Sequence, residues 1–186
     1  MVSDTLTGFP DTKGHYADGH IQKLRAYKVV NGYEDGTFRP DNPVTRGEFA
    51  VIAANALENA CGYALKPTYV FSDIDGHYSA DSVAKLTSCG MLSGYEDGTF
   101  RPAEHISRGQ AAIITANLLL FCGVQPKDAV STFPDTAGHY ADKHIQMLIH
   151  YGVVNGYEDG TFRPDENVTR GQAAIMIANA LTVVGK

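Results

Sequence analysis

The sequence predicts a mainly α fold, with three tandem helix-loop-helix repeats around a pseudo-threefold axis and a central three-helix bundle. One observation behind this is the string Gly-Tyr-Glu-Asp-Gly-Thr-Phe-Arg-Pro, which recurs unchanged at residues 32–40, 94–102 and 156–164. A second is an apolar pattern of helical period that follows each copy at the same distance. One such unit cannot bury its apolar stripe alone, whereas three can by packing about a shared axis. We expect repeats over residues 1–70, 71–132 and 133–186 that form one integrated domain and share one conformation.

The composition is that of a globular protein and argues against two classes of partner. Hydrophobic residues make up 44% and charged residues 19% of the 186 residues, a balance typical of a chain with a packed core. The formal net charge is −6, and neither Lys nor Arg forms a run. We therefore expect no nucleic acid and no membrane as partner. In agreement, no apolar run approaches the ~18 residues that a membrane span needs.

Each repeat should begin with a short helix. A Phe-x-Asp segment and a Gly-His-Tyr turn come first, and then Ile21 and Leu24 lie three residues apart, the spacing of one helix face. This helix should end near Gly90 or Gly152, because glycine favours the left-handed conformation at a helix end, although repeat 1 has Lys28 there. The repeated aspartates most simply cap the turn or helix that follows them: Asp11, Asp73 and Asp135.

A turn and a longer helix complete each repeat. The Asp-Gly pair between two aromatic residues predicts a tight turn or a very short hairpin, and the following proline stops any strand. Thr45 and Glu48 then form a capping-box motif at a helix start, as do Ser107 with Gln110 and Thr169 with Gln172. The apolar stripe of this helix in repeat 1 consists of Phe49, Ile52, Ala53, Ala56, Leu57 and Ala60.

An arginine follows the capping residue in every repeat, at Arg46, Arg108 and Arg170. At the first position of a helix a cation is unfavourable by about 0.3–1 kcal/mol, so stability alone does not explain it. A guanidinium beside the free N–H groups of a helix start is suited to binding a carboxylate or phosphate. The alternative is that each arginine pairs with a nearby carboxylate, such as that of Glu34 or Asp35.

Glycines and tyrosines accompany each arginine. The glycine after the arginine (Gly47, Gly109 or Gly171) costs about 0.5–1 kcal/mol inside a helix, which indicates either close approach of a ligand or tight helix packing. Two sets of tyrosines offer flat surfaces on which sugar rings can stack, and one set is expected to be half-buried in the core. These sets are Tyr16, Tyr78 and Tyr140, and Tyr33, Tyr95 and Tyr157. The glycines Gly32, Gly94 and Gly156 serve the turn first and a ligand second.

Metal, cofactor and catalytic interpretations are weak. Asp73 and Asp75 faintly resemble a calcium loop, but repeats 1 and 3 have Lys13 and Ala137 at the second position. The repeated histidines His15, His77 and His139 have no repeated partner at ligand spacing and are interpreted as polar turn residues. No nucleophile motif or phosphate loop is present. We expect no metal, no cofactor and no enzymatic activity, since an enzyme usually has one special site and this chain has three equal ones.

Three cysteines, Cys61, Cys89 and Cys122, are too few for a disulfide framework. At most one bridge can form, and free, half-buried thiols are the favoured interpretation. The first residues, Met1 to Asp4, lack the basic and apolar regions of a signal peptide. The chain is therefore expected to be either cytoplasmic or a piece of a longer protein.

The combined motifs resemble the S-layer homology domain family. The pattern runs Phe-x-Asp, Gly-His-Tyr-Ala, Ile-x-x-Leu, Gly-Tyr-x-Asp-Gly-Thr-Phe-x-Pro and Thr-Arg-x-Glu, and it covers the whole chain. The resemblance implies a pseudo-threefold spindle with grooves between adjacent repeats. It also implies a non-catalytic anchor that binds a pyruvylated secondary cell-wall polysaccharide at the bacterial surface. The chain would then be part of a larger secreted protein whose signal peptide lies outside this sequence.

Carried over to this chain, the resemblance assigns the pyruvyl carboxylate to the three arginines. The helix-start Thr, Ser, Glu and Gln residues would line the grooves. This chain departs from the family pattern at Tyr16, Tyr78 and Tyr140, where tryptophan is usual, and at the glycine after each arginine. It departs again at Gln110 and Gln172, where glutamate is usual, so three equal grooves are not expected. The full ligand-binding set is Arg46, Arg108, Arg170, Thr45, Ser107, Thr169, Glu48, Gln110, Gln172, Tyr16, Tyr78, Tyr140, Gly32, Gly94 and Gly156.

Two rival functions belong to other classes. One is a structural self-assembly module of a surface layer, whose grooves take carboxylates of neighbouring S-layer subunits without direct glycan binding. The other is a hydrolytic enzyme, which the threefold duplication disfavours.

Overall fold

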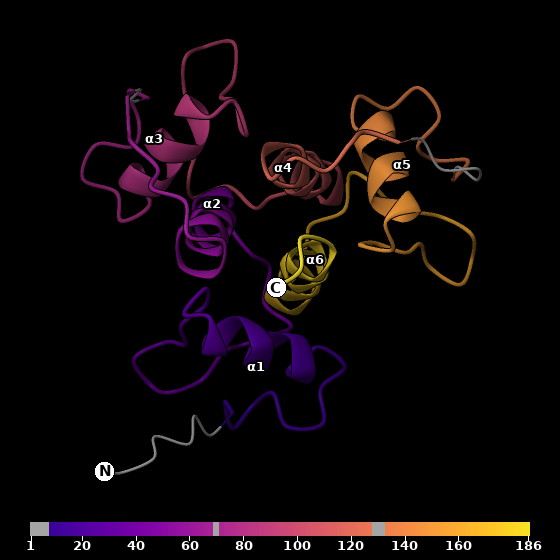
Figure 1. The fold of residues 1–186 in the computed structure, drawn as a ribbon, viewed down its shortest axis with the longest axis horizontal. Coiled ribbons are helices and arrows are strands. Elements are labelled where there is room, and N and C mark those ends of the chain that lie inside the picture. Colours follow the sequence, from indigo (N-terminus) through magenta and orange to yellow (C-terminus); the bar gives the residue numbers. More distant parts are fainter. Residues whose placement is uncertain (1–7, 69–70, 128–132) are drawn as a thin grey trace.

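The computed structural model describes residues 8–68, 71–127 and 133–186 (Figure 1). The expectation about residues 1–4 lies outside them. Each repeat contributes one short and one long helix, and the described residues contain no β-strand, which confirms the mainly α fold. None of the described helices has both the length and the apolar character to span a membrane. The helices are α1 (Asp18–Ala26), α2 (Arg46–Asn55) with a π-helical turn η1 (Ala56–Ala60), α3 (Ala80–Ser88), α4 (Arg108–Phe121), α5 (Asp142–His150) and α6 (Arg170–Val183).

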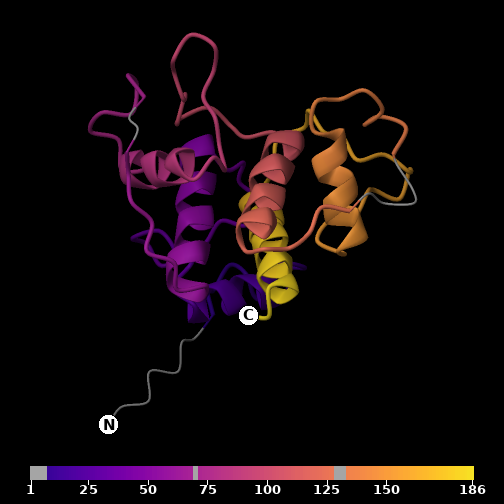
Figure 2. The ribbon, with the colours of Figure 1, turned by 45° about the horizontal axis from the view of Figure 1, so that its top comes forward.

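The long helices α2, α4 and α6 form a central bundle, and the short helices lie around it (Figures 1 and 2). Each short helix packs on the long helix of the preceding repeat: α3 on α2, α5 on α4, and α1 on α6. Since repeat 1 packs on repeat 3 in this way, the ring of repeats is closed. The predicted pseudo-threefold arrangement is confirmed.

A ring of backbone hydrogen bonds closes the same arrangement at the start of the long helices. The N–H of Val44 donates to the carbonyl of Val168 at 2.9 Å, that of Ile106 to Val44 at 3.1 Å, and that of Val168 to Ile106 at 3.0 Å. Each residue lies just before a long helix and belongs to a different repeat. The three helix starts are therefore held at fixed positions relative to one another.

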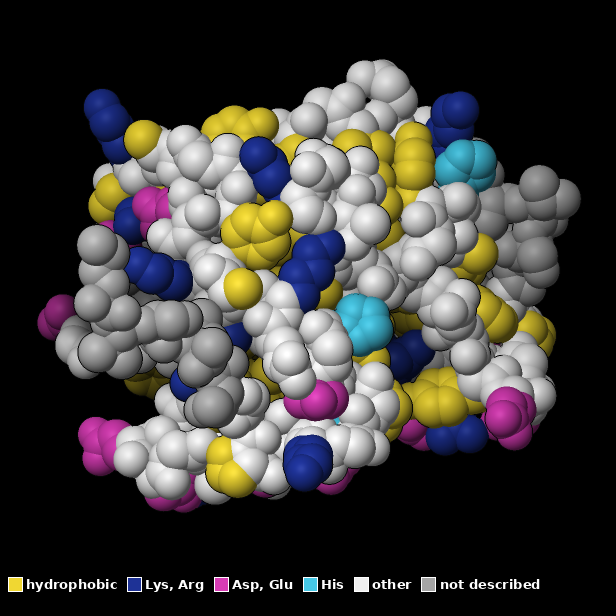
Figure 3. Space-filling view, turned by 60° about the horizontal axis from the view of Figure 1, so that its bottom comes forward, with side chains coloured by type: hydrophobic (Ala, Val, Ile, Leu, Met, Phe, Trp, Pro, Cys, Tyr) yellow, Lys and Arg dark blue, Asp and Glu magenta, His cyan; other side chains and the backbone are white. Residues whose placement is uncertain are grey.

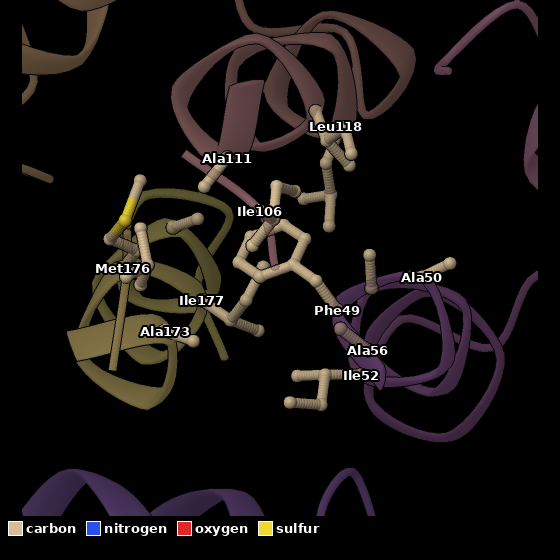
Figure 4. Close-up of a cluster of buried hydrophobic side chains, with 14 of the residues drawn as sticks. Phe49, Ala50, Ile52, Ala56, Ile106, Ala111, Leu118, Ala173, Met176 and Ile177 are labelled. Atoms are coloured by element: carbon tan, nitrogen blue, oxygen red, sulfur yellow. The ribbon is translucent and has the colours of Figure 1, made fainter. Parts of the chain in front are cut away.

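The centre of the bundle departs from threefold symmetry. Phe49 points between the three long helices beside Ile106 and Ile177 (Figure 4). It is fully buried, and the matching positions of the other repeats are Ala111 and Ala173. Three phenylalanines would overfill a close-packed axis, so one large and two small side chains share it.

The C-terminal ends of the long helices correct the expectation that all three repeats share one conformation. Helix α2 passes into η1, which accommodates one more residue than the ends of α4 and α6 before the helix stops. The C-cap residues are Cys61, Cys122 and Val184. A left-handed glycine follows each of them. The short helices end as predicted, with left-handed Lys28, Gly90 and Gly152 just beyond them: φ is 57°, 70° and 67°.

Candidate functional site

The predicted helix starts are confirmed in all three repeats. Each long helix begins at its arginine, and the capping box before it is complete, with both reciprocal hydrogen bonds formed. In repeat 1 the Thr45 hydroxyl accepts from the Glu48 N–H at 3.1 Å, and the Glu48 carboxylate accepts from the Thr45 N–H at 2.8 Å. The box therefore fixes both the helix start and the direction of the Glu48 side chain.

The expectation that free N–H groups at the helix start bind an anion is wrong. The Arg46 and Gly47 N–H groups donate to the carbonyls of Glu104 and Pro102 in the next repeat, at 2.8 and 2.9 Å. Repeats 2 and 3 repeat this pattern with the carbonyls of Glu166, Pro164, Asn42 and Pro40. Because packing between repeats uses these donors, only the side chains remain to bind an anion.

Each arginine reaches into the turn of the following repeat. Arg46 is 6% exposed, and its Nε donates to the Phe100 carbonyl at 2.8 Å and its Nη2 to the Ser93 carbonyl at 3.4 Å. Its guanidinium carbon also lies 4.8 Å from the centre of the Tyr95 ring and 4.5 Å from that of Phe100. Carbonyls and aromatic faces thus hold the cation rigidly without neutralising it.

Arg108 repeats this arrangement in the turn of repeat 3. Its Nε donates to the Phe162 carbonyl at 2.8 Å and its Nη2 to the Asn155 carbonyl at 3.2 Å. Neither Arg46 nor Arg108 forms an ion pair in the described part of the chain, and neither Nη1 finds an acceptor there. Burial lowers the pKa of both guanidinium groups, because it removes water that stabilises the charge.

Arg170 differs because it meets a carboxylate. Its Nε donates to the Phe38 carbonyl at 2.9 Å, as expected from the other repeats, but its Nη1 donates to Glu48 Oε1 at 3.0 Å. The two side chains are 8% and 19% exposed, so this is a largely buried ion pair. The alternative of internal pairing therefore holds for one arginine, with Glu48 as partner. Asp35 pairs instead with Arg39 at 2.7 Å.

The arginines open into three grooves of similar volume, about 320, 330 and 350 Å³. We number each groove by the repeat that supplies its turn and its Glu or Gln. Each groove takes its arginine from the preceding repeat and an exposed tyrosine from the following one. Groove 1 contains Arg170, Glu48, Tyr33 and Tyr78; groove 2 contains Arg46, Gln110, Tyr95 and Tyr140; groove 3 contains Arg108, Gln172, Tyr157 and Tyr16.

The two sets of tyrosines divide as expected. Tyr16, Tyr78 and Tyr140 are 61%, 67% and 61% exposed and stand at the groove rims. The other set is half-buried, and each of its rings lies between two guanidinium groups. In groove 2, Tyr95 lies between Arg46 and Arg101, whose guanidinium carbon is 3.9 Å from the ring centre. The rim set is thus the one open to stacking on a ligand.

The turn that forms each groove floor is held by an aspartate. The Asp11 carboxylate accepts from the N–H groups of Phe38 and Arg39 at 2.9 and 2.6 Å, and the other repeats match. The expectation that these aspartates cap the segment after them is therefore wrong. Burial raises the pKa of Asp11, but the N–H groups of Phe38, Arg39 and Asp11 itself together outweigh it and hold the pKa below its usual range.

The glycines serve packing. A Cβ on Gly47 would lie 2.8 Å from Ser79 Oγ and 3.0 Å from the Pro102 carbonyl. A Cβ on Gly32 would lie 2.4 Å from the Phe9 ring. Of the two interpretations of the glycine after the arginine, tight packing between repeats is confirmed. Gly32, Gly94 and Gly156 still line the grooves.

The structure also places the helix-start Thr and Ser residues, the repeated histidines and a second set of arginines. Thr45, Ser107 and Thr169 do not line the groove volumes, because their hydroxyls serve the capping boxes. The imidazole of His15 accepts from the Ala17 N–H at 3.1 Å and so holds the start of α1, which agrees with a turn role. The arginines that flank the tyrosines, Arg39, Arg101 and Arg163, were not predicted as site residues, although they belong to the repeated string.

Part of each of the three repeats matches a known protein family. The family model of the S-layer homology domain matches at residues 8–50, 70–112 and 132–174. Cell surface glycoprotein 1 of Acetivibrio thermocellus is 36% identical over 166 residues, 84% of this chain and 7% of that protein. The Cellulosome-anchoring protein of the same organism is 35% identical over 158 residues, 82% of this chain and 35% of that protein.

A third relative, S-layer protein EA1 of Bacillus anthracis, is 28% identical over 171 residues, 91% of this chain and 20% of that protein. This chain therefore spans between 7% and 35% of the length of these relatives. The three family matches keep the register of the repeat and cover more than half of the sequence. The chain belongs to the S-layer homology domain family.

Proposed function

We propose that this chain is a non-catalytic module that anchors a larger protein to the bacterial cell wall. It would do so by holding an acidic wall glycan in its inter-repeat grooves. The observation that carries the proposal is a pair of buried, unpaired guanidinium groups, Arg46 and Arg108, each of which opens into a groove with a tyrosine on its rim. A buried cation without a counter-ion is costly, and an anionic ligand would relieve that cost.

A sugar that carries a carboxylate fits this chemistry. The free Nη1 of Arg46 would donate a charge-assisted hydrogen bond to the carboxylate. The Gln110 Nε2 has no acceptor among the described residues and would donate to a sugar hydroxyl. Tyr140 would lie against the ring face, since aromatic side chains supply large amphipathic contacts. A pyruvate ketal on an amino sugar supplies such a carboxylate, so we propose a pyruvylated secondary cell-wall polysaccharide as the ligand.

The names of two relatives support an anchoring role. One is a cellulosome-anchoring protein, and another is an S-layer protein. In the described residues no group of three or more His, Cys, Asp or Glu side chains is arranged to hold a metal ion. On the face drawn in Figure 3, Lys and Arg side chains lie scattered among apolar and acidic ones. The basic side chains drawn on this face thus do not gather into one broad patch.

Calorimetric titration with a pyruvylated amino sugar tests the proposal, with the same sugar lacking the pyruvate as control. We expect saturable binding of the acidic sugar and much weaker binding of the neutral one. Absence of binding, or equal affinity for both sugars, contradicts glycan anchoring. Light scattering that rises with protein concentration in the absence of glycan would instead support self-assembly with other S-layer subunits.

A further inference from the structure

The C-terminal end of the helical bundle carries two cysteines at equivalent places. The constant repeat register pairs Cys61 with Gly123, not with Cys122. The π-helical turn η1 shifts the end of α2 by one residue, so Cys61 and Cys122 become the C-cap residues of neighbouring bundle helices. Val184 holds the third equivalent position. The backbone thus brings together two thiols that lie in different repeats.

Contacts around the two C-caps show that these helix ends meet. The ring of Tyr63 packs edge-on against that of Phe121, with 5.0 Å between ring centres, and these residues flank Cys61 and Cys122 in the chain. After burial, the largest influence on the pKa of each thiol is the other thiol, so the two side chains lie near each other. Both are free and half-buried, and helices α2 and α4 are in contact. Cys89 is also free, but it lies at the end of the peripheral helix α3.

We propose that Cys61 and Cys122 are a modification site, at which oxidation forms a disulfide between the ends of η1 and α4. The oxidant would be a small-molecule or protein disulfide. One cysteine thiolate attacks a sulfur of that disulfide and releases its first thiol. The second cysteine thiolate then attacks the mixed disulfide and releases the other thiol. Two protein thiols lose two hydrogens and two electrons, and one external disulfide becomes two thiols.

The surroundings of the pair set its reactivity. Burial raises the pKa of both thiols, to about 11 for Cys122, whose neighbours are Cys61 and the hydroxyl of Tyr63. Lys186 is the charged group that favours the Cys61 thiolate. Because the thiolate is the reacting form, oxidation is slow at neutral pH and faster under alkaline conditions. The pair is therefore suited to a lasting cross-link rather than to rapid redox exchange.

The cross-link would act at a distance from the glycan grooves. The arginines lie at the N-terminal ends of the long helices, and helix α4 of 14 residues separates its two ends by about 21 Å. The bridge would close residues 61–122 into a loop and so stabilise the fold mainly by restricting the unfolded chain. In a module that anchors a larger protein under mechanical load, the bridge would hold repeats 1 and 2 packed against each other. This inference is independent of the proposed ligand.

The test treats the full chain with oxidised glutathione at alkaline pH and compares it with the variants Cys61→Ser, Cys122→Ser and Cys89→Ser. Wild type and Cys89→Ser should lose two titratable thiols, lose the mass of two hydrogens, and yield a peptide that joins residues 61 and 122. Their unfolding temperature should rise, and the other two variants should show none of these changes. The same oxidation of chemically denatured chain reports whether the reagent is active.

Three outcomes overturn the proposal. One is that the folded wild type keeps all its thiols under conditions in which the denatured chain oxidises. The second is that glutathione adds to single cysteines without an internal cross-link. The third is that Cys89 is the partner in the bridge, or that bridges form between molecules.

Discussion

Groove 1 and groove 2 are built on the same backbone, yet their carboxylates lie in different places. In groove 1, Glu48 pairs directly with the buried Arg170, and Asn42 stands at the repeat position that Glu104 holds in groove 2. In groove 2 the groove residue is Gln110, and Glu104, which is 52% exposed, lies 3.7 Å from the outer Arg101. Groove 3 follows groove 2, with Gln172 and Glu166. At these two positions each groove has one carboxylate, and the grooves differ in which position holds it.

The position of the carboxylate decides what each groove offers to a ligand. A charge pair in a buried, low-dielectric place interacts several times more strongly than an exposed pair in water. Glu48 therefore neutralises the arginine of groove 1 in a direct ion pair. Glu104 and Glu166 form no ion pair with Arg46 or Arg108 in the described part of the chain and only attract them from a greater distance. The threefold symmetry of the backbone thus does not give the three grooves the same distribution of charge. On the proposed function, an acidic sugar should prefer grooves 2 and 3.

The largest expected effect comes from removal of Arg46 or Arg108. Arg46→Ala or Arg108→Ala should each weaken one binding site by about 1.5–3 kcal/mol, the range for a hydrogen bond to a charged group. Arg170→Ala should leave the affinity and stoichiometry for the acidic sugar nearly unchanged. Calorimetric titration of the three variants checks this. Equal losses in all three would show that Glu48 does not distinguish groove 1.

A smaller effect is expected when the carboxylate of Glu48 and the amide of Gln110 are each replaced by the other group. Gln110→Glu should pair with Arg46 and weaken groove 2 by about tenfold, or about 1.4 kcal/mol. Glu48→Gln should free Arg170 and raise the stoichiometry from two sites to three. Both residue types complete a capping box in this chain, so Gln110→Glu should unfold close to wild type. Glu48→Gln should unfold at a lower temperature, because it leaves the buried Arg170 without its counter-ion. A stoichiometry unaffected by Glu48→Gln would contradict the comparison.

The rim tyrosines should contribute about 1 kcal/mol each through ring contact. Tyr140→Ala should weaken groove 2 alone, whereas Tyr140→Phe keeps the ring and should bind almost as wild type. Titration of both variants separates stacking from the hydroxyl. If Tyr140→Ala binds as tightly as Tyr140→Phe, the rim ring does not contact the sugar.

The smallest expected effect is a loss of stability at low pH, which the turns of all grooves should share. Hydrogen bonds from Thr99 and Arg101 lower the pKa of Asp97 from 3.8 to about 2, and Asp159 matches it. Because these pKa values are depressed in the folded state, their contribution to stability is present above pH 3.8 and is lost as pH falls toward about 2. Thermal unfolding across this range should show a modest loss that Asp97→Asn reduces. An equal loss in Asp97→Asn would assign the acid effect to other groups.

Local features of the fold and site could be predicted from the sequence, because they depend on neighbours in the chain. The capping boxes, the arginine at the helix start and the left-handed helix ends all follow from a few adjacent residues. The closed ring followed from the repeat itself. The division of the tyrosines into a rim set and a half-buried set was expected, although the sequence did not say which set was which.

Features that depend on packing between repeats could not be predicted. Spacing does not reveal that Arg46 serves the groove of the next repeat, or that Pro102 and Glu104 occupy the N–H groups of α2. The Glu48–Arg170 pair joins residues that only the closed ring brings together. The π-helical turn shifts Cys61 by one residue against the constant repeat register. For the arginines and the ion pair, the decisive partner lies in another repeat.

A crystal structure of the chain with a pyruvylated amino sugar would show directly whether the three grooves differ. We expect the sugar in grooves 2 and 3, with its carboxylate on the guanidinium groups of Arg46 and Arg108 and its ring beside Tyr140 and Tyr16. We expect the Glu48–Arg170 pair to stay intact and groove 1 to hold no acidic sugar. A carboxylate bound to Arg170 in place of Glu48, or a sugar bound away from the arginines, would contradict the proposed difference between the grooves.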